Sequence, residues 1–345
     1  MKKLLRRLAP AVALCALVLA PSSLRAQGPF HVEHVWKIGG SGFWDYMTIA
    51  PHTHRLYLTH GDRVDIVSTT TGKKLGAVTG LHGIHCVVFS SDGIHGYITD
   101  GGANQVAVFN RRTDKIVKRI PVGNHPDGAV FEPVTKTVWA FDGGSNTVSV
   151  ISTKTNTLVA TIQLPGRPEF PVADGRGDVF DNIASTSQIV RFNARTRKLV
   201  NTWSLAPCQH PSGLAIDPAH NRLFSVCHNG MMAVVDDRNG KVVATPAIGE
   251  GPDAARFSAA DQFAFSSNGG SGTLTVVRED SPDRYTVVQN LHTEMGARTM
   301  ALAPDGSHLY LVTAKFGPRP PATPQNPHRW PSILPGSFQV IVVGK

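Results

Sequence analysis

Ionisable residues recur along this chain roughly every forty residues, each one just after a turn and at the start of a short apolar run. They are, in order along the chain, Asp45, His85, Asp127, Glu169, Asp253 and Arg298, and Ser212 takes the place between Glu169 and Asp253. Carboxylates suit Ca²⁺ or Mg²⁺, whereas imidazoles suit Zn²⁺ or Cu²⁺. Acids crowded into one cleft also shift one another's pKa. We therefore expect a ligand site wherever the fold brings these positions together.

Two further histidines, His125 and His210, stand two positions before members of this series, and each is followed by proline. A ring built from all these positions is too wide for every residue to share one ion. We therefore expect a divalent cation to be held by residues of neighbouring repeats, namely His85, Asp127 and Glu169. The alternative is a structural collar of salt bridges, in which Arg298 joins Asp253 to Asp45.

The sequence contains no local motif of a known catalytic or haem site. It has neither a His-Glu-x-x-His nor a Gly-x-Ser-x-Gly segment, and it has no Cys-x-x-Cys-His. A second polar set follows the second apolar run of six repeats: His60, Asp100, Asp142, Asn182, His228 and Asn268. We expect most of this second set to be turn residues, because Asp and Asn side chains bond to nearby backbone.

The elements that must position these residues form a unit that occurs seven times. The units begin at Gly42, Leu81, Gly123, Pro165, Ala206, Gly249 and His292. Each unit contains four short apolar runs separated by turns, for example CVVF, GYIT, VAVF and KIVKRIPV in the second, and no stretch has a sustained helical period. This pattern predicts an all-β, seven-bladed β-propeller with four-stranded antiparallel blades, as a single domain over residues 27–345.

The two ends of the chain are predicted to close this ring. The segment His31–Ile38 reads as a strand that belongs to no preceding unit, so we expect it to be the outer strand of the seventh blade and to remove the open edge. A Pro-rich insertion at 317–336 interrupts that blade between its second and third strands. It is either a lid or partner-docking loop, or a tolerated surface insertion.

The repeats resemble those of a known family. Tyr97-Ile98-Thr99-Asp100 is close to the Tyr-Val-Thr-Asn signature, and the segment from Lys115 to Gly123 is similar to the fourth-strand consensus. Over nearly the whole mature protein the chain resembles the YVTN-repeat, YncE-like propellers, although blades four and seven depart from the pattern. The resemblance implies the propeller fold and export, but no single chemistry, because propellers serve as binding proteins, lactonases, lyases and oxidoreductase subunits.

The first 26 residues have the features of a secretory signal peptide. Lys2, Lys3, Arg6 and Arg7 precede an apolar run too short to span a membrane, and Ala26 suits the cleavage position. We expect a periplasmic or secreted protein with no transmembrane segment in the mature chain. Removal of five basic residues lowers the net charge from +9 to +4, and Lys and Arg form only short clusters such as Arg111-Arg112, so nucleic-acid binding is not expected.

Three cysteines remain in the mature chain. In an oxidising compartment we expect a disulfide between Cys208 and Cys227, because both adjoin the first two strands of blade five, and a buried free thiol at Cys86.

Two functions remain open from the sequence. The first is a monomeric binding or scaffold propeller that engages a small ligand, a metal or a protein partner at the channel mouth. The second is a metal-assisted lactonase or lyase with His85, His125 or His210 as acid or base. No complete catalytic set can be named from the sequence.

The signal peptide generates the first prediction. Cleavage after Ala26 gives a mature protein that begins at Gln27. Expression with export, followed by intact-mass measurement of the product, should show the loss of residues 1–26. A cytosolic product that keeps Met1 would contradict it.

Overall fold

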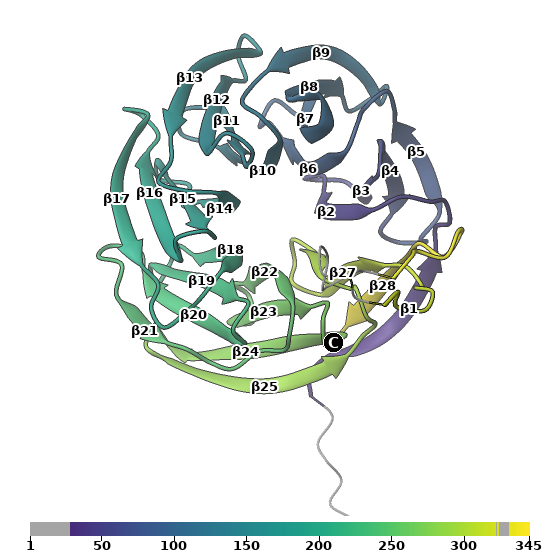
Figure 1. The fold of residues 1–345 in the computed structure, drawn as a ribbon, viewed down its shortest axis with the longest axis vertical. Helices are drawn as coiled ribbons and strands as arrows, with labels where there is room; N and C mark the ends of the chain where they lie inside the picture. Colours follow the sequence, from purple (N-terminus) through teal and green to yellow (C-terminus); the bar gives the residue numbers. More distant parts are fainter. Residues whose placement is uncertain (1–27, 322, 324–330) are drawn as a thin grey trace, which may run out of the picture.

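Seven antiparallel sheets of four strands each surround a central channel in the computed structural model, which describes residues 28–321, 323 and 331–345 (Figure 1). Within each sheet the strands follow one another from the axis outward. The predicted seven-bladed propeller is therefore confirmed. Over the described residues the one helical element is the short 3₁₀ turn Gly101–Ala103, and no helix is long and apolar enough to cross a membrane.

The strands are given blade by blade, from the axis outward. Blades one to three comprise β2 Trp44–Ile49, β3 Arg55–His60, β4 Arg63–Ser68 and β5 Lys74–Val78; β6 Ile84–Phe89, β7 His95–Asp100, β8 Gln105–Asn110 and β9 Lys115–Pro121; and β10 Pro126–Glu132, β11 Thr137–Asp142, β12 Thr147–Ser152 and β13 Thr157–Gln163. Blades four and five comprise β14 Pro168–Ala173, β15 Asp178–Ile183, β16 Gln188–Asn193 and β17 Lys198–Ser204; and β18 Pro211–Asp217, β19 Arg222–Cys227, β20 Met231–Asp236 and β21 Val242–Ala244. Blades six and seven comprise β22 Pro252–Ser258, β23 Phe263–Asn268, β24 Thr273–Ser281 and β25 Arg284–His292; and β26 Thr299–Leu302, β27 His308–Thr313, β28 Gln339–Gly344 and β1 His31–Lys37.

The hydrophobic core lies between neighbouring blades. Tyr57 of blade one packs against Phe89 and Phe109 of blade two, with ring centroids 4.9 and 5.8 Å apart. Phe224 of blade five stacks on Phe257 of blade six at 4.9 Å. Each blade thus buries both faces of its inner strands against its neighbours, which explains why these strands read as nearly continuous apolar runs.

The chain ends meet in blade seven as expected. Strand β1 pairs antiparallel with β28 along its whole length, from His31 opposite Gly344 to Lys37 opposite Gln339. The side chain of Trp36 lies 5.8 Å from the ring of Tyr310 in the same blade. This pairing joins the N-terminal and C-terminal segments and leaves no break in the ring (Figure 1).

Cys208 and Cys227 form a disulfide, and Cys86 is a buried free thiol, as the sequence indicated. The bond ties the turn before β18 to the end of β19. The Pro-rich insertion leaves blade seven after β27 and returns before β28, and a bridge between Phe316 and Ile333 joins its two arms. The segment predicted to be a signal peptide, residues 1–26, and residues 322 and 324–330 of the insertion lie outside the described residues.

The closing strand generates the second prediction. Trp36 is half-buried against blade seven, whereas its neighbour Val35 is 46% exposed. Trp36→Ala should lower the free energy of unfolding by about 1–3 kcal/mol, because it removes apolar contacts from the strand that closes the ring. Val35→Ala is the matched control and should change it by less than about 0.5 kcal/mol. Equal effects of the two substitutions in denaturant unfolding would contradict this role of β1.

Candidate functional site

A β-bulge interrupts the innermost strand of six of the seven blades at its second residue, where an extra residue bends the strand. The bulges lie between Trp44 and Met47, Ile84 and Val87, Pro126 and Ala129, Pro168 and Pro171, Pro211 and Leu214, and Pro252 and Ala254. Each contains one residue of the predicted ionisable series or Ser212. The bulges therefore set where these side chains point at the channel mouth.

Side chains of neighbouring blades hold the backbone of these bulges. Thr99 Oγ1 of blade two donates to the carbonyl of Asp127 in blade three at 2.7 Å, and Thr299 Oγ1 of blade seven donates to the carbonyl of Asp45 in blade one at 2.8 Å. Ser267 makes the equivalent bond from blade six to the carbonyl of Arg298. These supporting residues were not identified from the sequence. Thr99 and Ser267 stand at the penultimate position of the second strand of their blades, whereas Thr299 begins the innermost strand β26.

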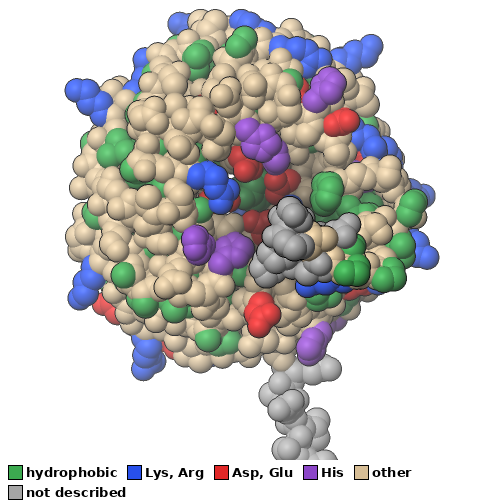
Figure 2. Space-filling model, viewed as in Figure 1, with side chains coloured by type: hydrophobic (Ala, Val, Ile, Leu, Met, Phe, Trp, Pro, Cys, Tyr) green, Lys and Arg blue, Asp and Glu red, His purple; other side chains and the backbone are tan. Residues whose placement is uncertain are grey.

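The channel mouth gathers charged side chains into one group, which we call the rim. It consists of Asp45, His85, Asp127, Glu169, Ser212, Asp253 and Arg298. Figure 2 shows acidic, basic and histidine side chains around the central hollow on this face. The side chains are partly buried, with Asp45 16% and Glu169 12% exposed. The sequence alignment thus placed every member of the rim at one end of the ring.

The closest contacts of the rim centre on His85. Its Nδ1 lies 2.7 Å from Asp45 Oδ2 and 3.6 Å from Asp127 Oδ1. One ligand atom from each of these three residues lies within 4.8 Å of the others, a geometry that could hold a metal ion. The imidazole of His125 meets the ring of His85 edge-on, with centroids 4.8 Å apart.

The metal ligands expected from the sequence differ from this group in one member. Glu169 was expected beside His85 and Asp127, but the structure has Asp45 in that position. Glu169 Oε1 instead faces Arg167 Nη1 at 2.5 Å. Asp45 of blade one thus completes the group from the other side of His85, while Glu169 of blade four is paired with Arg167.

The other side of the rim is a chain of salt bridges. Arg298 Nε lies 2.7 Å from Asp253 Oδ2, and its Nη2 lies 3.6 Å from Asp45 Oδ1. Asp253 also accepts a hydrogen bond of 2.7 Å from Ser212. The collar of salt bridges predicted from the sequence is therefore present on this side of the rim. Through Asp45 it adjoins the cluster of Asp45, His85, His125 and Asp127, which we call the histidine group.

Burial and mutual repulsion disturb the protonation of the rim. Burial first, and then the charge of Asp45, raise the pKa of Asp127 to about 7 despite the opposing effect of His85. Burial and the charge of Asp127 raise the pKa of Glu169 to about 8. Although burial alone would lower the pKa of His85, its hydrogen bond to Asp45 raises it. Near neutral pH, Asp127 and Glu169 therefore hold protons that a bound cation could replace.

The predicted histidines His125 and His210 occupy equivalent turns above the rim. Both have φ near the left-handed region, 52° and 48°, and the same turn position is glycine in two other blades, Gly83 and Gly251. His125 contacts His85, whereas His210 lies apart from it, in a pocket of about 280 Å³ that also contains Arg167, Glu169 and His228. The structure therefore places only His125 within the histidine group.

The second polar set serves mostly within its own blades. Asp142 accepts hydrogen bonds from Thr147 and Ser149, and Asn268 donates to Thr273 and Thr275, so both bond side chains of the next strand and not the turn backbone that was expected. The sequence alignment chose Asn182 and His228 for blades four and five, each one residue away from the position equivalent to Asp142. The strand pairing places Ile183 and Cys227 at that equivalent position. Because a one-residue shift reverses the face of a strand, Asn182 points to the neighbouring blade and donates to Ser212 O.

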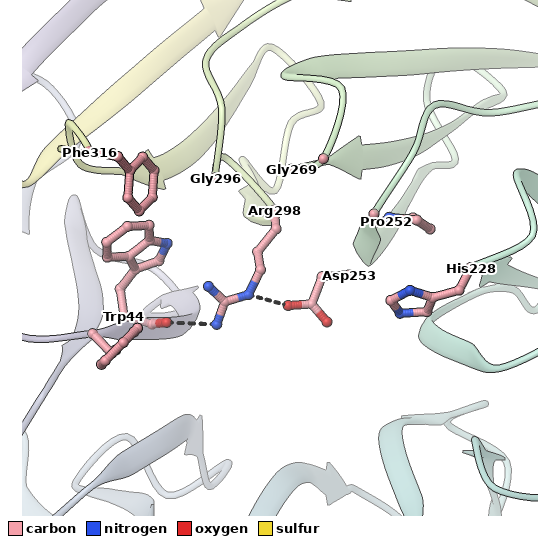
Figure 3. Close-up of a pocket in the computed structure, with 11 residues that line it drawn as sticks. Trp44, His228, Pro252, Asp253, Gly269, Gly296, Arg298 and Phe316 are labelled. Atoms are coloured by element: carbon pink, nitrogen blue, oxygen red, sulfur yellow. Dashed lines mark hydrogen bonds and ion pairs between the residues drawn. The ribbon is translucent and has the colours of Figure 1, made fainter. Parts of the chain in front are cut away.

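A pocket of about 340 Å³ opens beside Arg298 and Asp253 (Figure 3). Trp44 and Phe316 form one wall, and the indole lies 5.9 Å below the guanidinium of Arg298. Phe43 adds an aromatic side chain that is 71% exposed, and four glycines also line the pocket: Gly251, Gly269, Gly270 and Gly296. Sequence reasoning missed this pocket, because Phe316 reaches it from the segment between β27 and the insertion of blade seven, whereas Trp44 belongs to blade one.

Comparisons with known proteins identify the fold and no family. Neither a protein-family model nor a curated protein sequence matches the chain. Among solved structures, Kuenenia stuttgartiensis hydrazine synthase is similar over 81% of this chain and 94% of its own, with a TM-score of 0.70 and 17% identity. U3-55K covers 91% of this chain and 98% of its own, with a TM-score of 0.74 and 11% identity. The WD40 repeats of RRP9 cover 92% and 99%, with a TM-score of 0.75 and 12% identity.

At these identities the similarity concerns the fold alone. The chain is a seven-bladed β-propeller whose structural neighbours include WD40-repeat proteins. What the neighbours bind or catalyse does not extend to the rim, because propellers with one architecture carry unrelated sites.

The raised pKa values generate the third prediction. The folded protein keeps protons on Asp127 and Glu169 up to about pH 7 and 8, whereas an unfolded chain loses them near pH 4. Their contribution to stability is thus complete below about pH 4, falls progressively as the pH rises from there, and is gone above about pH 7 for Asp127 and about pH 8 for Glu169. The melting temperature should fall between pH 6 and pH 9, and Asp127→Asn should reduce this fall by roughly 2–4 °C.

The control for this prediction is Asp305→Asn, which removes an exposed carboxylate in the turn between β26 and β27. It should leave the difference between pH 6 and pH 9 unchanged. If Asp127→Asn and Asp305→Asn give the same fall, the rim does not control this part of the stability.

Proposed function

We propose that this protein is an exported binding propeller of the YVTN-repeat, YncE-like kind, which takes a small ligand at the rim through a divalent cation. The observation that carries the proposal is the group of Asp45, His85 and Asp127, whose ligand atoms lie within 4.8 Å of one another. One imidazole and two carboxylates are a donor set that divalent metals accept.

The charge of the rim supports a cation there. Arg298 is engaged by Asp253 and Asp45, and Arg167 is engaged by Glu169. Asp127 forms no ion pair with an arginine or lysine among the described residues, and burial together with the charge of Asp45 raises its pKa to about 7. A divalent cation would supply the missing positive charge and displace the protons.

The adjoining pocket offers space for an organic part of the ligand. Arg298 links the two, because it contacts Asp45 of the histidine group and borders the 340 Å³ pocket. Its guanidinium has donors in a planar fork, which suits a carboxylate or similar group of a ligand. Trp44 and Phe316 provide flat apolar surface beside it. A small molecule with one anionic group and an apolar or aromatic portion fits these contacts.

A metal-assisted lactonase or lyase is the second candidate, and His125 is the observation in its favour. Burial and the neighbouring His85 lower the pKa of His125, so this imidazole is neutral at physiological pH and can accept a proton. It lies beside the metal-binding group, where a cation could polarise a carbonyl. A metal-dependent hydrolysis of a lactone that is lost in His125→Gln would favour this candidate over pure binding.

The cation site generates the fourth prediction. Titration of the mature protein with Zn²⁺, Ca²⁺ or Mg²⁺ in a calorimeter should show one site for at least one of these ions. Because the ion displaces protons from the rim, binding should release protons and tighten as the pH rises from 6 to 8. The same titration in two buffers of different ionisation enthalpy measures the proton release.

Asp127→Asn should weaken the affinity at least tenfold, since it removes a ligand. Asp305→Asn is the control, because it removes the same charge at a distant exposed turn, and it should leave the affinity unchanged. If the wild-type protein binds none of the three ions, or if both variants behave alike, the rim is a structural collar and the proposal fails.

A further inference from the structure

The far end of the channel has a second cavity, of about 440 Å³, which differs in character from the rim. It is lined by the later residues of the six inner strands whose second residues form the rim. The lining residues of these strands stand one to four positions after the rim residues, so at about 3.3 Å per residue the cavity reaches roughly 13 Å from the rim. Apart from Arg256, the lining side chains are uncharged and nearly all apolar, including Phe131, Val172, Ile216 and Phe257.

A buried layer separates this cavity from the rim. Tyr46, Cys86 and Ala129 are each less than 5% exposed and pack together with Phe170. The rings of Tyr46 and Phe170 lie 4.6 Å apart. The two ends of the channel are therefore separate environments, one acidic and one apolar.

Arg256 is the only ionisable side chain that lines the apolar cavity. Its guanidinium lies 5.0 Å from the ring centre of Phe170, and its Nη1 donates to the carbonyl of Ala255 at 2.7 Å. Over the part of the chain that the structure describes, no carboxylate forms an ion pair with it. Most of its five N–H donors are thus left for another acceptor.

The ionisable groups near Arg256 provide no negative charge. They are the thiol of Cys86, whose pKa burial raises to about 12, and the phenol of Tyr46, whose pKa burial also raises. Both are neutral at physiological pH. A cation held among apolar side chains without a counter-charge is costly, and a bound anion would offset that cost.

We propose that this apolar cavity is a second binding site, which takes a small monocarboxylate with an apolar body. The carboxylate pairs with the fork of Arg256, and the apolar body replaces water against Phe131, Phe257 and their neighbours. A single charge is implied, because one arginine balances one carboxylate and a dianion would leave a charge unpaired. The volume lies within the range of small-molecule sites. This site goes beyond the function proposed for the rim.

Octanoate is a suitable probe. The comparison compounds are 1-octanol, which is uncharged, and octylammonium, which is positively charged, and both have the same chain length. Calorimetry with the mature protein should show one site for octanoate, at least tenfold weaker binding of 1-octanol, and no binding of octylammonium. Arg256→Gln should weaken octanoate binding at least tenfold, whereas Arg256→Lys, which keeps the charge, should retain part of the affinity. Arg112→Gln removes an exposed arginine outside the cavity and should have no effect.

Two further measurements separate this site from the rim and from a structural role of Arg256. Asp127→Asn should leave octanoate binding unchanged, so failure of the cation site does not decide this proposal. Without ligand, Arg256→Gln should melt no lower than the wild type, because it removes an uncompensated charge. Equal binding of octanoate and 1-octanol, unchanged binding in Arg256→Gln, or no binding of octanoate to the wild type would each overturn the proposal.

Discussion

The close approach of neighbouring inner strands at the axis is the constraint on which the rest of this structure depends. Gly128 is a direct consequence, since a Cβ there would collide with the carbonyl oxygen of Glu169 in the next blade. Gly213 stands in the same relation to Asp253 and Ala255. Where strands come this close, a side chain of one blade can bond the backbone of the next, as Thr99 does to Asp127. The ring is therefore held at its centre by polar contacts and between blades by apolar packing.

The same constraint produces the unusual electrostatics of the rim. Bulges at equivalent places turn side chains from six blades toward one axis, and so carboxyl groups from different blades are buried beside one another. Arg298 balances Asp253 and part of Asp45, but Asp127 is left to His85. Raised pKa values follow from this imbalance. An arrangement of this kind destabilises the fold slightly at high pH, which is common where a site is built for a ligand.

The two ends of the channel differ because the inner strands change character along their length. Their second residues are mostly charged and partly exposed, the residues that follow include the layer of Tyr46, Cys86 and Phe170, and the later residues that line the far cavity are mostly apolar. Arg256 is the exception at the apolar end, as Arg298 is at the acidic end. Each arginine thus interrupts a surface of otherwise uniform character, and each is therefore the residue best placed to orient a ligand on its side.

The sequence by itself determined the number of blades, the four strands of each, the closing role of His31–Ile38 and the positions that form the rim. It could do so because a repeat imposes equivalent positions, and equivalent positions share one place in the ring. Only the tertiary structure decided which rim residues touch. Asp45 rather than Glu169 lies beside His85 and Asp127, and the strand pairing places Ile183 and Cys227 where Asn182 and His228 were expected. The pocket beside Trp44 and the lack of a carboxylate partner for Arg256 also depend on contacts between blades. Such contacts produce no regular residue spacing that could be recognised in the sequence.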